Sequence, residues 1–435
     1  MPALPVVKIH GATRRDVGIA LGKLAAPTMP AFLRQSSTWA ALQVWREPPR
    51  SARVDSMRAA TRRAFPQLWE EFEGLAEGLG MPVDDVFLFA CRGDLLHHTD
   101  DGCTTIAVAY DQTTENAQTD APAASAAVAA RGLSDNQPSG DRPRHRLIGH
   151  NEDGDPYLLH KCWIVDVTIG GTGGRKTQDE GSGEDKTDGE GGTDGCGYVS
   201  FYYPGSLPGH AFGFNRHGLV QTINNVRVAR PRADGVPRVF LTRAVLDCRT
   251  LDEAVSVLCA APRASGFHHT LACVGDPRIL SVEAVCSACS VLHVRHAFGH
   301  SNHVVHNGLR EVDQQVITPS SASRQRRIDE LASHLRSRCD VKRLTLAETR
   351  EAAKSPQRCA TALDIVDALR DTACASLPIY RTAPDDPDGE TNLAIAVFDL
   401  PADSSDQATL KIFCRDPVMR RPSLIIPIPA QKRNP

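Results

Sequence analysis

The chain has 435 residues, enough to bury the core of one large domain or two ordinary ones. Its formal net charge of -3 shows no basic excess, so the composition argues against a nucleic acid partner. No segment approaches the roughly 18 to 20 uncharged residues of a membrane helix, and the 13 cysteines follow no regular spacing, so we expect a cytoplasmic protein with reduced thiols and no membrane contact.

Helical patterns dominate the first hundred residues. A short strand is predicted at residues 6–9, and Thr13 then suits the cap of a helix. Amphipathic helices are predicted at residues 65–76 and 82–91. We therefore predict that residues 1–102 form a helical leading segment, a pro-segment or small subunit that packs against the rest of the chain.

Strand patterns begin at Cys103. Strands are predicted at residues 104–110, 146–151, 163–169, 198–203, 270–274, 279–285, 290–294, 393–400 and 409–413, with a strand pair within 211–223. Helices are predicted at residues 239–247, 251–258, 322–336 and 362–369, the second with Thr250 as cap and Glu253 three residues on. Without regular alternation of strand and helix, this mixture predicts a layered α+β catalytic domain over residues 103–425.

Two segments inside this domain have a different composition. Residues near 113–143 are rich in Ala, Ser, Asp and Pro, and residues near 170–197 are mostly Gly, Asp, Glu, Thr and Lys. Such segments bury too little apolar surface to offset the cost of ordering. We expect disordered insertions at hairpin tips, where added length costs little.

Cys103 is the candidate nucleophile, because it opens an apolar strand directly after a polar turn. A thiol needs only a modest push from a base or a nearby positive charge. Gly102 can hold a strained turn and expose its carbonyl to the neighbouring sulfur, which would cut the Gly102–Cys103 bond. The freed α-amine, with an ordinary pKa of about 7.7 to 8.0, could then act as a general base. The simpler alternative is a buried structural cysteine after an ordinary turn.

Polar residues gather after two later strands. Residues 149–155 combine His150 and Asn151 with several acids, which could contact substrate or steer the α-amine, although turn formation also explains them. Residues 299–306 hold three histidines and Asn302. They lack the helical spacing of two histidines and a glutamate, so no metal is predicted, whereas the asparagine amide could donate to a developing oxyanion.

Other candidates are more isolated. Asn224 and Asn225 follow a hairpin and could be further oxyanion or substrate contacts, or turn residues. Arg381 could place positive charge near the thiolate, with a surface role as the alternative. Cys286 and Cys289 have no second pair to complete a zinc site, so we expect strand or core, with redox chemistry as the alternative.

Four of these segments, in order, resemble the acyl-coenzyme A:6-aminopenicillanic acid acyltransferase family of cysteine N-terminal-nucleophile hydrolases. Residues 101–105 are similar to the family's self-cleavage site, and residues 149–153 to its Gly-x-Asn-x-Asp segment. Residues 213–224 resemble its Gly-Phe-Asn-x-x-Gly hairpin, and residues 300–303 its His-Thr-Asn-His turn.

The resemblance implies a four-layer αββα sandwich with two antiparallel sheets. It implies Cys103 as nucleophile, Asp153 as the active-site acid and Asn302 as an oxyanion-hole residue. Penicillin-type members use an arginine shortly before the penultimate strand, and residues 388–392 contain none. Penicillin chemistry is therefore in doubt.

Our hypothesis is an autoprocessing cysteine amidohydrolase or acyltransferase that works through an acyl-Cys103 intermediate without a cofactor. Its substrate would be a small N-acyl amide or an acyl thioester such as acyl-coenzyme A. The leading segment would stay associated after cleavage. The alternatives are a hydrolase of the same fold that does not cut itself and a non-catalytic binding scaffold.

Overall fold

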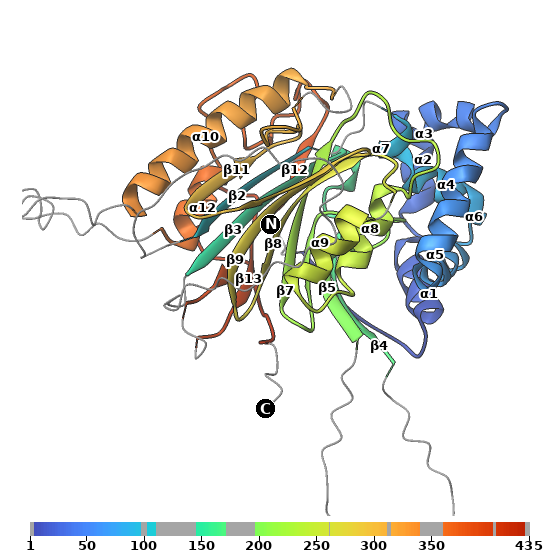
Figure 1. Cartoon of the computed structure of the whole chain (residues 1–435), viewed down its shortest axis with the longest axis horizontal. Coiled ribbons are helices and arrows are strands. Elements are labelled where there is room, and N and C mark those ends of the chain that lie inside the picture. Colours follow the sequence, from blue (N-terminus) through green and yellow to red (C-terminus); the bar gives the residue numbers. More distant parts are fainter. Residues whose placement is uncertain are drawn as a thin grey trace, which may run out of the picture.

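The computed structural model describes residues 4–96, 102–109, 145–170, 196–260, 262–310, 315–339, 360–402 and 406–430 (Figure 1). Apart from Gly170, Cys196 and Gly197, the two predicted insertions lie outside these ranges. The described residues combine helices with two β-sheets, which confirms the predicted α+β class.

The larger sheet has eight strands in the order β1-β4-β5-β6-β7-β8-β9-β10. They are β1 (Val6–Gly11), β4 (Trp163–Ile169), β5 (Cys196–Tyr202), β6 (Phe212–Asn215), β7 (Leu219–Val226), β8 (Gly266–Cys273), β9 (Asp276–Ala284) and β10 (Cys289–His293). β1 pairs in parallel with β4, and the remaining neighbours are antiparallel.

The second sheet has six strands in the order β11-β2-β3-β12-β13-β14. They are β11 (Ala297–His300), β2 (Cys103–Ala109), β3 (Arg146–Gly154), β12 (Thr391–Leu400), β13 (Thr409–Phe413) and β14 (Leu424–Pro427), and all neighbours are antiparallel. The edge strands β11 and β14 were not predicted, because four residues are too few to show a clear alternating pattern.

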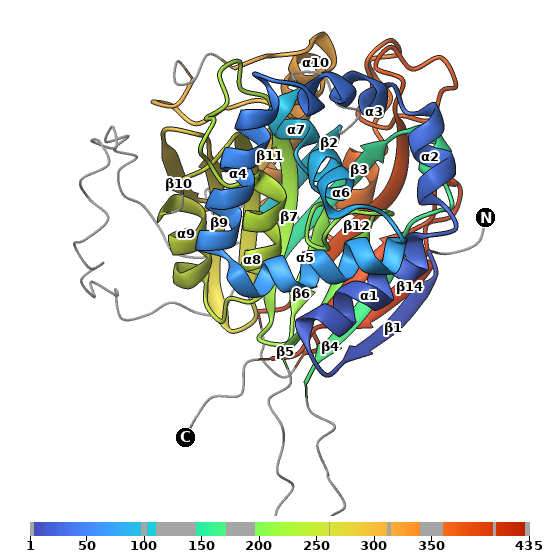
Figure 2. The ribbon, with the colours of Figure 1, turned by 90° about the vertical axis from the view of Figure 1, so that its right-hand side faces the viewer.

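Helices cover both sheets (Figure 2). The leading segment contains α1 (Arg14–Ala25), α2 (Met29–Gln35), α3 (Ser37–Leu42), η1 (Gln43–Arg46), α4 (Ser51–Ala64), α5 (Pro66–Leu79), α6 (Val83–Ala90) and α7 (Arg92–Leu95). Later helices are η2 (Pro156–Leu158), α8 (Arg238–Val245), α9 (Leu251–Ala260), α10 (Pro319–Cys339) and α12 (Ala362–Leu369). Thr13 and Thr250 cap α1 and α9 as predicted, accepting from the backbone N–H groups of Asp16 and Glu253 at 3.1 Å each.

The two sheets face each other across a shared core. The rings of Phe212 on β6 and Phe398 on β12 lie 6.5 Å apart across this interface. On the outer sides, α10 and α12 pack on the six-stranded sheet, while α9 packs on β8, β9 and β10 of the larger one. Every residue of β2 and β3, including the polar ones, is therefore buried.

A strand, close helix packing and a buried ion pair attach the leading segment to the rest of the fold. β1 extends the larger sheet, and α1 packs so closely on α5 that a Cβ added at Gly18 would lie 1.9 Å from the Glu71 carbonyl oxygen. The Glu71 carboxylate accepts two hydrogen bonds of 2.8 Å from the fully buried guanidinium of Arg243 on α8. Detaching the segment would break this fully buried ion pair and leave Arg243 only its ion pair with Asp247 at 3.0 Å among the described residues, and breaking a buried pair is costly.

One pair of cysteines departs from the expected reduced state. Cys259 of α9 and Cys289 of β10 form a disulfide across 30 residues of sequence. The spacing gave no sign of it, because only the packing of α9 on β10 brings the two together. Cys286 keeps its thiol, which donates to the Ala264 carbonyl oxygen at 3.3 Å.

None of the described helices is both long enough and apolar enough to cross a bilayer.

Candidate functional site

Cys103 opens β2 and is 4% exposed. Gly102 precedes it in a space with no room for a side chain, since an added Cβ would lie 2.0 Å from Glu390 Oε2 and 2.8 Å from Arg381 Nη1. The Gly102 carbonyl oxygen accepts a hydrogen bond of 2.9 Å from the backbone N–H of Asp153. The peptide bond between Gly102 and Cys103 is therefore fixed and its carbonyl polarised.

Glu152 is the acid that meets the thiol. The β2–β3 register places Cys103 opposite Glu152, and Sγ lies 3.6 Å from Glu152 Oε2. The same oxygen lies 2.9 Å from His150 Nε2, and Glu152 Oε1 accepts from the Tyr203 hydroxyl at 2.5 Å. His150 and Glu152 share a face of β3, because side chains two residues apart point to the same side.

Thr105 determines where the protons of this group lie. Asn224 Oδ1 can only accept, so the Thr105 hydroxyl donates to it at 2.8 Å and must itself accept from His150 Nδ1, also at 2.8 Å. Burial lowers the pKa of His150 to about 3, so the ring is neutral near pH 7 and its Nε2 atom accepts. The hydrogen between Nε2 and Oε2 therefore belongs to the Glu152 carboxyl.

Asn302 holds the backbone nitrogen of Cys103. Its Oδ1 atom accepts from the Cys103 N–H at 3.0 Å and from Arg324 Nη2 at 2.7 Å. Its Nδ2 atom donates to the Asn225 carbonyl oxygen at 3.1 Å. We expected an oxyanion donor at this position, but in the uncut chain the amide oxygen is the group that faces Cys103.

Arg324, on α10, is a site residue that the sequence did not reveal. It is 1% exposed, and its Nη1 atom donates to the Cys103 carbonyl oxygen at 2.6 Å and to Thr104 Oγ1 at 3.0 Å. Tyr203 and Thr105 were also missed. The sequence indicated Arg324 only weakly, because its helix contains several arginines. Which of them is buried depends on the side of the helix that faces the sheet, and the sequence did not determine that side.

Asp153 lies beside the peptide bond between Gly102 and Cys103 but away from the thiol contact. Its Oδ1 atom accepts from Asn392 Nδ2 at 3.1 Å, while its buried Oδ2 atom has no hydrogen-bond partner among the described residues. Burial raises the pKa of the Asp153 carboxyl, although the charges of Arg381 and Arg324 oppose the shift. Asp153 thus offers one unsatisfied acceptor near the Cys103 backbone.

The asparagines predicted as further site residues, Asn151, Asn224 and Asn225, bind to backbone and side-chain groups around the site. Asn224 donates from Nδ2 to the His300 carbonyl oxygen at 3.2 Å, and Asn225 Oδ1 accepts from Arg238. Asn151 points to the opposite face, where its Nδ2 atom donates to the Leu369 carbonyl oxygen at 2.7 Å.

Arg381 is buried, so the alternative of a surface role is wrong. It is 2% exposed and pairs with Asp386 at 2.5 Å, with Asp388 at 2.7 Å and with Glu390. Three acids thus offset its charge. Arg381 forms a wall against Gly102.

A metal ion could be held by the same atoms that surround the thiol. Cys103 Sγ, a His150 ring nitrogen and a Glu152 oxygen all lie within 4.8 Å of one another, the only such group of three among the described residues. Sulfur, imidazole and carboxylate are all zinc ligands. Of the histidines in residues 300–306, His300 donates from Nε2 to Glu283 at 2.9 Å and His306 donates to Glu283 from its backbone N–H at 3.1 Å, whereas His303 Nδ1 lies 2.7 Å from Ser321 Oγ.

His269, on β8, is a second buried neutral histidine, and it yields a stability prediction. Burial lowers its pKa to about 3, so below the ordinary value of 6.5 the unfolded chain binds a proton that the folded chain does not. His269→Gln should therefore remove about 2 kcal/mol of the destabilisation that accompanies a change from pH 7 to pH 5.

Urea unfolding of both proteins at the two pH values measures this difference, with the exposed His10→Gln as the matched control. An identical pH dependence in the His269 variant and the wild type would contradict the assignment.

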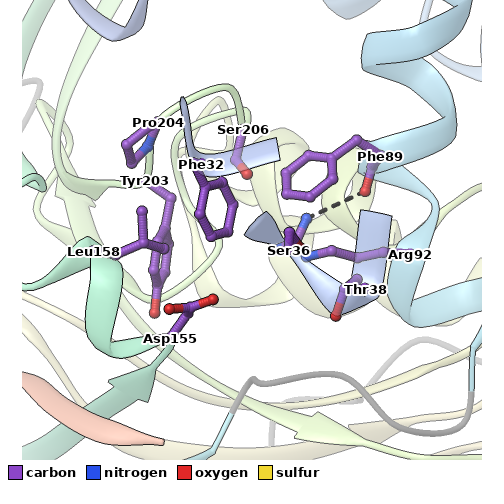
Figure 3. Close-up of a pocket in the computed structure, with 10 residues that line it drawn as sticks. All are labelled: Phe32, Ser36, Thr38, Phe89, Arg92, Asp155, Leu158, Tyr203, Pro204 and Ser206. Atoms are coloured by element: carbon purple, nitrogen blue, oxygen red, sulfur yellow. Dashed lines mark hydrogen bonds between the residues drawn. The ribbon is translucent and has the colours of Figure 1, made fainter. Parts of the chain in front are cut away.

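A cavity lies next to this site (Figure 3). It is lined by Phe32, Ser36, Thr38, Phe89, Arg92, Asp155, Leu158, Tyr203, Pro204 and Ser206. Tyr203 connects it to Glu152 through the 2.5 Å hydrogen bond. Half of the lining residues come from the leading segment, so no pattern within residues 103–425 alone could have predicted the cavity.

Comparison with known proteins gives two matches. The model of the acyl-coenzyme A:6-aminopenicillanic acid acyl-transferase family matches residues 139–406, a range that includes Glu152, Asn302 and Arg324 but not Cys103. The chain is also 26% identical over 264 residues to a beta-alanyl-dopamine/carcinine hydrolase of Drosophila melanogaster. That alignment covers 59% of this chain and 57% of the relative, so the chain matches little more than half of the relative's length.

Proposed function

The chain belongs to the acyl-coenzyme A:6-aminopenicillanic acid acyl-transferase family, and we propose that it is an amide hydrolase or acyltransferase with Cys103 as its nucleophile. The observation that carries this proposal is the contact between the Cys103 thiol and Glu152, 3.6 Å away and backed by His150. A thiol kept only for packing would need no such proton acceptor.

The thiol is activated by transfer of its proton. The S–H proton passes to Glu152 Oε2 as the hydrogen already on that oxygen passes to His150 Nε2, leaving a thiolate and an imidazolium. The thiolate attacks the substrate carbonyl, and the same pair returns a proton to the leaving amine or thiolate. Water or an acceptor amine then attacks the acyl-Cys103 thioester.

Self-cleavage at Gly102–Cys103 would use the same groups. The Asp153 N–H, 2.9 Å from the Gly102 oxygen, would stabilise negative charge as the sulfur attacks the carbonyl carbon. The acyl group moves from nitrogen to sulfur, the Cys103 nitrogen gains a proton, and water hydrolyses the thioester. Asn302 Oδ1 and Asp153 Oδ2, which has no hydrogen-bond partner among the described residues, would then orient the new α-amine.

The released amine should be a better base than the buried pair. His150 is hard to protonate where it lies, whereas an α-amine has an ordinary pKa of about 7.7 to 8.0. This difference favours an autoprocessed enzyme over the alternative of a hydrolase that works uncut. The non-catalytic scaffold is disfavoured by a proton acceptor held against the thiol.

The fold and subunit arrangement follow from this assignment. The two facing sheets with helices on their outer sides support the four-layer αββα sandwich of N-terminal-nucleophile hydrolases. After cleavage the leading segment would remain bound, since β1 is part of the larger sheet and Glu71 pairs with the buried Arg243. The proposed substrates are small N-acyl amides, and the relative's name makes β-alanyl-dopamine and carcinine the first to test.

The direct test combines N-terminal sequencing with a substrate panel. We expect purified protein to contain a fragment that begins at Cys103, to hydrolyse some N-acyl amides or acyl thioesters, and to become acylated at Cys103 by a thiol-reactive acyl probe. Treatment with EDTA should leave turnover intact. Probe reaction spread evenly over the cysteines, with no turnover of any substrate, would refute the function.

A further inference from the structure

The cavity beside Tyr203 has the chemistry of a site for a cation. We propose that it binds the protonated amine of an aminoacyl amide substrate, with Asp155 as the counter-ion. This inference rests on the proposed function, because it assigns the acyl group on which Cys103 would act.

Tyr203 connects the cavity to the groups around the Cys103 thiol. The Tyr203 hydroxyl lines it and donates to Glu152 Oε1 at 2.5 Å, while the other oxygen of Glu152 meets the Cys103 sulfur at 3.6 Å. Asp155 follows the end of β3, three residues after Glu152. Asp155 and Tyr203 thus line the same cavity, and Tyr203 connects that cavity to the acid that meets the Cys103 thiol.

Asp155 presents a carboxylate to this space. Its Oδ1 atom accepts from the Tyr157 N–H at 2.8 Å, which fixes the side chain. Figure 3 shows the carboxylate and the Tyr203 hydroxyl turned toward the same end of the cavity. Within the described ranges, Asp155 forms no ion pair with Lys or Arg, so a ligand cation can take that place.

The rest of the lining fits an ammonium group at that end. Phe32, Phe89 and Tyr203 supply aromatic rings, which attract cations. Arg92 extends from the opposite wall, where its guanidinium lies 4.6 Å from the Phe89 ring and would repel a cation. Ser206 Oγ is buried with no hydrogen-bond partner among the described residues, so it can bind a polar group of the ligand.

Because Phe32, Phe89 and Arg92 belong to the leading segment, the site exists only while that segment stays bound. A long fatty acyl chain fits this arrangement poorly, because it would cover the Asp155 carboxylate without pairing its charge. A short acyl group with a terminal ammonium would pair with the Asp155 carboxylate. Its methylene groups would contact the aromatic side chains that line the cavity.

The test compares two p-nitroanilides of equal shape, β-alanyl and butyryl, which differ by an ammonium in place of a methyl group. The wild type should prefer the β-alanyl substrate in kcat/KM, and the preference should fall as the substrate amine loses its proton at alkaline pH. Asp155→Asn should lower the preference about 10- to 100-fold, the loss expected for a charged hydrogen bond.

Asparagine keeps an oxygen for the Tyr157 N–H, so the loop should hold its shape. Asp84→Asn removes an equal charge from an exposed helix start and should leave the preference as it is. If Asp155→Asn does not change the ratio, or if wild type prefers butyryl, the inference fails. Acylation of Cys103 by the probe in that case would show that the proposed function still stands.

Discussion

Replacing Cys103 with Ala is expected to remove self-cleavage and to lower turnover by about 10⁴-fold or more, because it removes the sulfur that would attack the carbonyl and that Glu152 contacts at 3.6 Å. Intact-mass measurement should give one uncut chain, and acyl amides should remain unhydrolysed. The protein should still fold, since Cβ is kept and the Cys103 N–H and carbonyl still bind Asn302 and Arg324.

Cys162 is the sharpest control for this experiment. Its thiol is fully buried, and burial raises its pKa well above the usual range. It is therefore a thiol near the same acid that should not act as nucleophile. Cys162→Ala should still be cut and still turn over, whereas two fragments or residual turnover in Cys103→Ala would overturn the assignment.

The sequence singled out Cys103 as the candidate nucleophile but not the acid that touches its thiol. Glu152 and Asp153 are neighbours on β3, so they point to opposite faces, and only the pairing register decides which one meets Cys103. Register depends on the whole sheet, because a shift of one residue exchanges the faces. Strand patterns therefore located the acidic corner without resolving its two carboxylates.

Other elements were predictable where a local pattern was complete. β4 and α12 have the predicted bounds, because one is a β-branched run and the other begins at a Thr361 cap with Asp364 three residues on. Arg324 and the cavity were not predictable, since they depend on helix phase and on contacts between segments far apart in sequence. The partners of Arg381 lie close in sequence, but its burial against Gly102 required the fold.

Replacing Glu152 and Asp153 one at a time distinguishes the roles of the two carboxylates. Glu152→Gln should slow self-cleavage by about 10²- to 10⁴-fold, the usual contribution of a positioned acid-base group, because no α-amine exists before the bond is cut. The amide would keep an acceptor for Tyr203 but could not relay the thiol proton to His150. The measurement is the rate at which the fragment beginning at Cys103 appears.

Asp153→Asn should leave the rate of self-cleavage nearly unchanged and lower the turnover of substrate. Its backbone N–H would still bind the Gly102 oxygen, so cleavage should proceed, but the carboxylate that orients the free amine would be gone and turnover by the cut enzyme should fall. If Asp153→Asn instead blocked cleavage while Glu152→Gln left it intact, the thiol contact would have no catalytic meaning. The acid suggested by the family resemblance would then act alone, and proton relay through His150 would have to be abandoned.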